Sequence, residues 1–125
     1  MVAPKNIKDL QHVSRDLTTK RVDFNTYMVT SRTHPDTDYI VTVTFDKDGR
    51  HVKADCTCQW ATFNGIACSH VLATLEFMAA QKKRTLSFWN EETNARRQKH
   101  RLFKLVSNRD DEKDQSHVWI TSRNT

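Results

Sequence analysis

The chain has few apolar residues and no long apolar run. Of its 125 residues, 37% are hydrophobic, and only two are glycine and two are proline. No segment approaches the ~20 consecutive apolar residues that cross a bilayer, so we expect no membrane span. The first residues, MVAPKNIKDLQHVSRDL, hold no apolar stretch of the kind found in secretory signals. We therefore expect a cytoplasmic protein, and the content of Trp, Phe, Val and Leu argues against simple disorder.

Cysteine is also scarce, because the chain has only three. An odd number without a secretory signal argues against a disulfide framework. A bond between Cys56 and Cys58 would close a strained ring and leave Cys68 unpaired. All three lie within the segment ADCTCQWATFNGIACSHVLATL, and a histidine follows two residues after the last of them. Their placement therefore indicates one shared site.

Apolar periodicity in the first half of the chain predicts an antiparallel meander. Residues 6–17 carry apolar side chains three or four apart, which is typical of a helix. Alternating apolar and polar residues predict strands at 21–32, 39–45 and 50–56. An Asp-Gly turn at 48–49 joins the last two strands as a hairpin.

The second half predicts helices, a buried crossing segment at 86–89 and a final hairpin. An amphipathic helix begins near residue 70, with Ser69 as a plausible N-cap. Residues 91–101 predict a second helix with acids at its start and bases toward its end. The remaining expected elements are strands at 102–107 and 117–122 and a mobile charged loop at 108–116. The expected fold is a single α+β domain over 1–125, with a core at 39–80 that holds the three cysteines and a basic segment at 82–104.

The spacing of four residues predicts a closed metal site. Cys56-x-Cys58 is followed by nine residues and then by Cys68-x-His70. Two residues at i and i+2 on a strand point to the same face, so Cys56 and Cys58 can reach one ion. On a helix they would point apart, so Cys68 must precede the helix and His70 must open it. Three thiolates and one imidazole are a usual set for structural zinc. The alternative is that the cysteines are small buried hydrophobes beside an ordinary histidine.

This stretch resembles the SWIM zinc finger family, whose motif is CxC, a variable spacer and then CxH. The strand YIVTVTFD, the turn KDGR and the helix HVLATLEFMA lie where the family has them, so the likeness covers about 39–80. The segments RTLSFW and ARRQKHRLF are similar to the basic tail of small prokaryotic proteins with this finger. The family occurs in transposases, helicase-like ATPases, recombination mediators and ubiquitin ligases. The resemblance implies one structural zinc and binding of DNA, of proteins or of both, without catalysis.

Nothing in the sequence favours an enzyme or a small-molecule substrate. Catalytic zinc keeps an open coordination position, whereas four protein ligands are present here. There is no Walker loop, GxSxG, HExxH or GxGxxG motif. Two groups of aspartates, at 46–55 and 110–114, fit a hairpin turn and a solvated loop. A divalent-metal nuclease site at either group is the remaining enzymatic alternative.

The charge of the chain favours an anionic partner. The net charge is +5 and the pI is about 9.3, which suits nucleic acid, with DNA favoured over RNA. Eight bases against two acids lie in the basic segment. The candidate nucleic-acid contacts are Lys82, Lys83, Arg84, Arg96, Arg97, Lys99, Arg101 and Lys104. Arg97 and Arg101 would share one face of the helix expected at 91–101 and track phosphates. A solvated helix whose bases suit its C-terminal end is the alternative.

Two aromatic residues, Trp60 and Phe63, lie in the spacer of the finger. They are candidates for a recognition tip that stacks on bases or anchors a protein. Alternatively, they pack over the zinc and shield it from water. If a protein is the partner, these aromatics or the helix at 71–78 form the docking surface, and the finger serves as scaffold. The sequence leaves both partner classes open.

Overall fold

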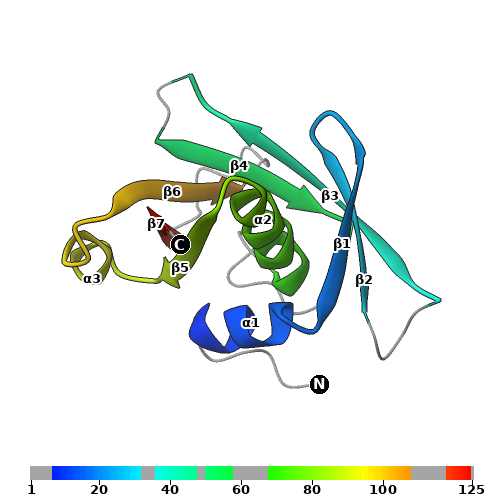
Figure 1. Ribbon diagram of the computed structural model, residues 1–125, viewed down its shortest axis with the longest axis horizontal. Coiled ribbons are helices and arrows are strands. Elements are labelled where there is room, and N and C mark those ends of the chain that lie inside the picture. The colour runs from blue at the N-terminus through cyan, green and yellow to red at the C-terminus, as the bar shows by residue number, and fades with distance from the viewer. Residues whose placement is uncertain (1–6, 32–35, 48–49, 58–67, 108–117, 125) are drawn as a thin grey trace.

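A seven-stranded sheet curls around one helix in the computed structural model of the chain (Figure 1). The structure describes residues 7–31, 36–47, 50–57, 68–107 and 118–124. The elements in chain order are α1 (Ile7–Ser14), β1 (Leu17–Asp23), β2 (Thr26–Ser31), β3 (Asp38–Phe45), β4 (His51–Cys56), α2 (Ser69–Gln81), β5 (Arg84–Trp89), α3 (Glu92–Arg96), β6 (Arg101–Ser107) and β7 (Val118–Asn124). The fold is therefore mixed α+β, as predicted, and most of it is strand. No helix in this part of the chain is long and apolar enough to cross a membrane.

The sheet has the strand order β1-β2-β3-β4-β6-β7-β5. Strands β1 to β4 form an antiparallel meander, and β4 pairs in parallel with β6. The antiparallel pairing of β6 with β7 agrees with the expected C-terminal hairpin. The crossing segment expected at 86–89 belongs to the edge strand β5, in which Phe88 is completely buried. The loop predicted at 108–116 lies outside the described residues.

The single strand predicted at 21–32 is wrong, because a turn at Phe24 and Asn25 divides it into β1 and β2. The Asp23 carboxylate accepts a hydrogen bond from the Phe24 amide at 2.7 Å. The Arg21 guanidinium donates to the carbonyl oxygens of Asp23 and Phe24 at 3.1 and 2.9 Å. The turn contains neither glycine nor proline, so the apolar alternation runs through it without a break.

The first helix is shorter than the predicted 6–17. It ends at Ser14, whose hydroxyl donates to the carbonyl oxygen of Gln11 at 2.7 Å. Such side-chain bonds to the backbone are common where helices bend or end. Leu17, which the periodicity assigned to the helix, instead opens β1 and packs against the core. Apolar spacing alone did not separate the last helical turn from the first strand residue.

Helix α2 is buried more completely than an amphipathic helix would be. The residues Val71, Leu72, Ala73, Thr74 and Leu75 follow one another around the helix and are all buried. The reason is the curl of the sheet: both edge strands, β1 and β5, contact α2, and α1 packs on it as well (Figure 1). Burial in the N-terminal half of the helix therefore extends beyond the single apolar face that was expected.

The basic helix predicted at 91–101 exists only in its first half. Helix α3 ends at Arg96, Lys99 has a left-handed φ of 54°, and Arg101 already opens β6. Ala95 is the only buried residue of α3. Without an apolar stripe to pack, a longer helix gains little from tertiary contacts, and short helices are marginal by themselves. Arg97 and Arg101 consequently do not share a helical face.

Candidate metal centre

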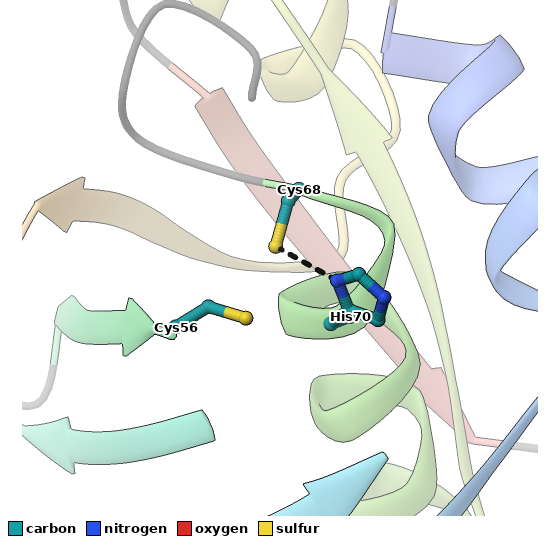
Figure 2. A group of neighbouring side chains, drawn as sticks. All are labelled: Cys56, Cys68 and His70. Atoms are coloured by element: carbon teal, nitrogen blue, oxygen red, sulfur yellow. Dashed lines mark hydrogen bonds between the residues drawn. The ribbon is translucent and has the colours of Figure 1, made fainter. Parts of the chain in front are cut away.

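Three potential metal ligands meet between the end of β4 and the start of α2. Cys56 is the last residue of β4, Cys68 is the N-cap of α2, and His70 is the second residue of the helix. Their side chains point toward one another (Figure 2), and their ligand atoms all lie within 4.8 Å of one another. Cys68 is buried, while Cys56 and His70 are partly buried.

The distance between two of these atoms fits zinc. The Cys68 Sγ lies 3.6 Å from the His70 Nδ1. In a tetrahedral site with a Zn–S distance of ~2.3 Å and a Zn–N distance of ~2.0 Å, a sulfur and a nitrogen ligand are about 3.5 Å apart. The pair is therefore spaced to share one ion, with Nδ1 as the nitrogen ligand. Two thiols and an imidazole also favour zinc, because calcium and magnesium prefer oxygen ligands.

The backbone explains why these residues converge. Cys68 has an extended conformation (φ −129°, ψ 172°) before the helix begins, so Cys68 and His70 need not point apart as i and i+2 do within a helix. This matches the expected order, although the N-cap is Cys68 and not Ser69. On the other side, Thr57 fastens the end of β4 to β3. Its amide donates to the Ile40 carbonyl at 3.1 Å, and its hydroxyl accepts from the Ile40 amide at 3.0 Å.

The family comparison agrees with this geometry. The family model of the SWIM zinc finger matches residues 39–78. Residues 39–78 form a SWIM zinc finger. The match spans β3, β4 and most of α2, and it covers roughly a third of the chain. No curated protein and no solved structure matches the chain. SWIM fingers are generally non-catalytic binding modules, and the cysteine and histidine group is positioned to bind one zinc ion.

The SWIM finger includes an aromatic contact that the motif does not contain. The ring of Tyr39, on β3, lies 4.2 Å from the His70 imidazole at an angle of 33°. The Thr74 hydroxyl donates to the His70 carbonyl at 2.9 Å, one turn further along the helix. The Tyr39 contact restricts the orientation of the ligand ring, while the Thr74 bond is to the backbone of His70. The alternation in β3 puts Tyr39 on the same face as Val41 and Val43, but nothing in the motif indicates its role beside the metal ligands.

The fourth predicted ligand of the SWIM finger is Cys58. Cys58 lies outside the described residues, as do the spacer aromatics Trp60 and Phe63. The structure thus brings together three of the four predicted ligands, and the fourth stays a prediction.

The N-terminus of α2 lies at the site, and its dipole favours the ionised form of a nearby thiol.

The predicted basic contacts separate into several groups. Lys82 and Lys83 follow α2, Arg84 opens β5, and Arg97 and Lys99 flank the end of α3. Arg96 is paired with Glu92 on its own helix, with Nε 2.6 Å from the carboxylate. On β6, Arg101 and Lys104 are three residues apart and so face opposite sides of the sheet. Lys104 lies over the ring of Trp119, with Nζ 5.5 Å from its centroid.

Three of the eight bases do meet, at the end of α2 that is farthest from the metal ligands. Lys82, Arg84 and Arg101, called the basic trio below, line one pocket. Its apolar wall includes Phe45 and Phe103. The Arg84 guanidinium donates to the hydroxyl and the carbonyl of Ser122 and to the side chain of Asn124. No Asp or Glu among the described residues lines this pocket.

Proposed function

We propose that this chain is a non-catalytic module that binds nucleic acid, with DNA favoured over RNA, through the basic trio. The observation that carries the proposal is the convergence of Lys82, Arg84 and Arg101 on one pocket without a lining carboxylate. Cations gathered without acids create a positive potential that attracts phosphates. The preference for DNA rests on the resemblance to SWIM proteins of transposition and recombination.

In this proposal the zinc supports the fold and takes no part in chemistry. Cys56, Cys68 and His70 hold it, with Cys58 as the predicted fourth ligand. A zinc ion with four protein ligands supplies a cross-link between β4 and α2, because no coordination position is left for a substrate. The finger therefore fixes the helix whose far end carries Lys82.

The basic trio replaces the phosphate-tracking helix expected from the sequence. Arg96 is a weaker candidate, since its charge is offset by Glu92 in an exposed (i, i+4) ion pair. Lys82 and Arg101 are exposed, so their side chains can reach a backbone phosphate. Arg84 is half-buried and fixed by its bonds to β7, so it contributes a charge of defined position.

Fluorescence anisotropy against salt tests this proposal. Three phosphate contacts predict a slope of log K against log[salt] near −2.7 on duplex DNA and near −2 on a single strand. Between 50 and 200 mM salt, affinity for duplex should therefore fall roughly 40-fold. Lys82→Ala should reduce the slope by about one. The matched control is Lys20→Ala, an exposed lysine on β1 outside the pocket, which should leave it unchanged. A slope near zero for the unmodified protein would refute the proposal.

A protein-binding adaptor is the second candidate, and two exposed aromatic residues favour it. Phe24 is 81% exposed and Phe45 is 53% exposed. Large apolar side chains left in water often mark interaction sites. An apolar protein interface would keep its affinity as salt rises, whereas phosphate contacts weaken steeply. The dependence of affinity on salt therefore separates a nucleic-acid-binding module from a protein-binding adaptor.

A further inference from the structure

A second pocket extends the basic one along the same side of α2. It is lined by Phe24, Tyr27 and Val43 together with Phe45 and Met78. Phe45 and Met78 also line the pocket of the basic trio. The two pockets are therefore neighbours and form one groove, which we call the α2 groove. Its one end is aromatic, at the turn between β1 and β2, and its other end is cationic.

We propose that the α2 groove binds single-stranded DNA, with a base stacked on Phe45 and backbone phosphates held by Lys82 and Arg101. The inference rests on the proposed function and makes it more specific, because it names the form of the nucleic acid and the group that its bases contact. Proteins that bind single strands combine a positive groove with aromatic side chains, since every base has a π-face. The α2 groove has both features within the described residues.

The aromatic end is held in place before any ligand arrives. Phe24 lies at a turn in which Arg21 donates to two backbone carbonyls and Asp23 accepts the Phe24 amide. The turn thus presents Phe24 to solvent on a fixed backbone. Phe45 ends β3, pairs with Val52 on β4 and is still half exposed. Because both backbones are fixed, less conformational entropy is lost when a base stacks on either ring.

The size of the cationic end favours a single base over a duplex. The pocket of the basic trio measures about 110 Å³. A cavity of about 150 Å³ holds one benzene ring, so this smaller pocket admits only the edge of one flat ring system, with the rest of the base against Phe45 in its wall. The bases of a duplex are stacked inside it and would have to flip out to enter. A single strand offers unstacked bases without that expense.

Charge favours DNA over a peptide as the occupant. An aromatic side chain of a protein partner could fill the same apolar space. However, three cations surround it, and no Asp or Glu of the described residues lines either pocket. A peptide would need several acids at matching positions, whereas a nucleic-acid strand has one phosphate at every step. The guanidinium carbon of Arg101 also lies 5.3 Å from the centroid of the Phe103 ring, next to where a base would enter.

An abasic strand separates stacking from phosphate contacts. The probes are oligo(dT) of about 12 nucleotides, within the ~4–16 nucleotides of known single-strand sites, and an abasic oligonucleotide with the same number of phosphates. Phe45→Ala should weaken oligo(dT) binding about 5- to 150-fold, the range for one base–aromatic stack. It should leave binding of the abasic strand unchanged. Phe24→Ala is a second variant, at a site exposed enough for the fold to be kept.

The matched control is Val13→Ala, which shortens an apolar side chain on α1 that is about as exposed as Phe45. It should change neither affinity, and zinc content and melting temperature should be the same for all variants. Equal affinity of Phe45→Ala and the unmodified protein for oligo(dT) would overturn the groove inference. An equal loss of affinity of Phe45→Ala for oligo(dT) and for the abasic strand would also overturn it. The same holds if an acidic aromatic peptide displaces oligo(dT) but unlabelled oligo(dA) does not. If salt-sensitive DNA binding persists in such a case, the proposed function still stands; if no nucleic acid binds at low salt, both fail.

Discussion

Replacing Cys68 with serine should remove most of the stability of the fold. Structural zinc binding contributes about 10–16 kcal/mol in small zinc modules. A chain of 125 residues has a total stability of roughly 6–19 kcal/mol at ~0.05–0.15 kcal/mol per residue. Zinc between Cys56 and the Cys68–His70 pair also closes a loop comparable to the ~15-residue loop for which a cross-link contributes about 3 kcal/mol. Loss of the ion therefore removes a free energy comparable to the total stability of the fold.

The variant is chosen so that packing and capping are preserved. Serine is close to cysteine in size, and it is a preferred N-cap residue, so the start of α2 should not suffer from the exchange itself. The matched control is Ser69→Ala, a change at the next position, which is also buried, that removes no metal ligand.

Zinc content, far-UV circular dichroism and thermal melting give the answer. We expect Cys68→Ser to bind less than one zinc per chain and to melt at least ~10 °C lower than the unmodified protein, or to be unfolded at 25 °C. Ser69→Ala should stay within a few degrees. The result that refutes the reasoning is a zinc-free Cys68→Ser variant that melts within ~5 °C of the unmodified protein. In that case the core packing around α2 would suffice without the metal.

Two further predictions concern residues next to the site and the core. Tyr39→Leu should lower zinc affinity about tenfold in competition with a chromophoric chelator, whereas Tyr39→Phe should not, because the ring against His70 is what orients the ligand; equal affinities would remove Tyr39 from the site. Burial raises the pKa of Glu76 above its usual value near 4.5, against the opposing hydrogen bond from Gln11. The pKa of Glu76 is then higher in the folded state than in the unfolded state. The free energy of unfolding therefore falls as pH rises from the unfolded pKa through the folded pKa. Glu76→Gln should therefore melt higher than the unmodified protein at about pH 7 and equally at about pH 4, and a difference that is constant with pH would contradict this.

The metal ligands could be predicted because the features that position them are encoded in short stretches of sequence. An Asp-Gly turn and an alternating strand lead into Cys56, and an apolar helical pattern follows His70. Each feature is encoded within a few residues, so the sequence alone predicts a strand end and a helix start facing one ion. The structure adds Tyr39, whose contact with His70 depends on the pairing of β3 with β4.

The prediction of secondary structure failed where local sequence signals were absent or misleading. The turn at Phe24 and Asn25 is stabilised by the side chains of Arg21 and Asp23 rather than by glycine or proline. The stretch at 91–101 has helix-forming residues but only one that the fold buries, Ala95. Composition suggests a helix there, while the lack of an apolar stripe ends it after Arg96. Propensity is a weak guide when packing does not support it.

The α2 groove could not be predicted from the sequence at all. It joins Phe24 and Phe45 from the first half of the chain to Lys82 and Arg101 from the second. These residues meet because β4 pairs in parallel with β6, and β7 lies between β6 and β5. No periodicity within a short window encodes such pairings between distant segments. The same reason explains why eight bases that are close in sequence separate into one trio and several scattered charges.

The zinc and the α2 groove lie at opposite ends of α2, and this determines how each depends on the other. The helix has 13 residues, so its ends are about 20 Å apart. A base or phosphate held near Met78 and Lys82 is therefore too far from Cys68 to touch the metal. Zinc can influence binding only by holding α2 in the curl of the sheet. It follows that Cys68→Ser should lose DNA binding together with the fold, whereas Phe45→Ala should lose binding with its zinc still in place.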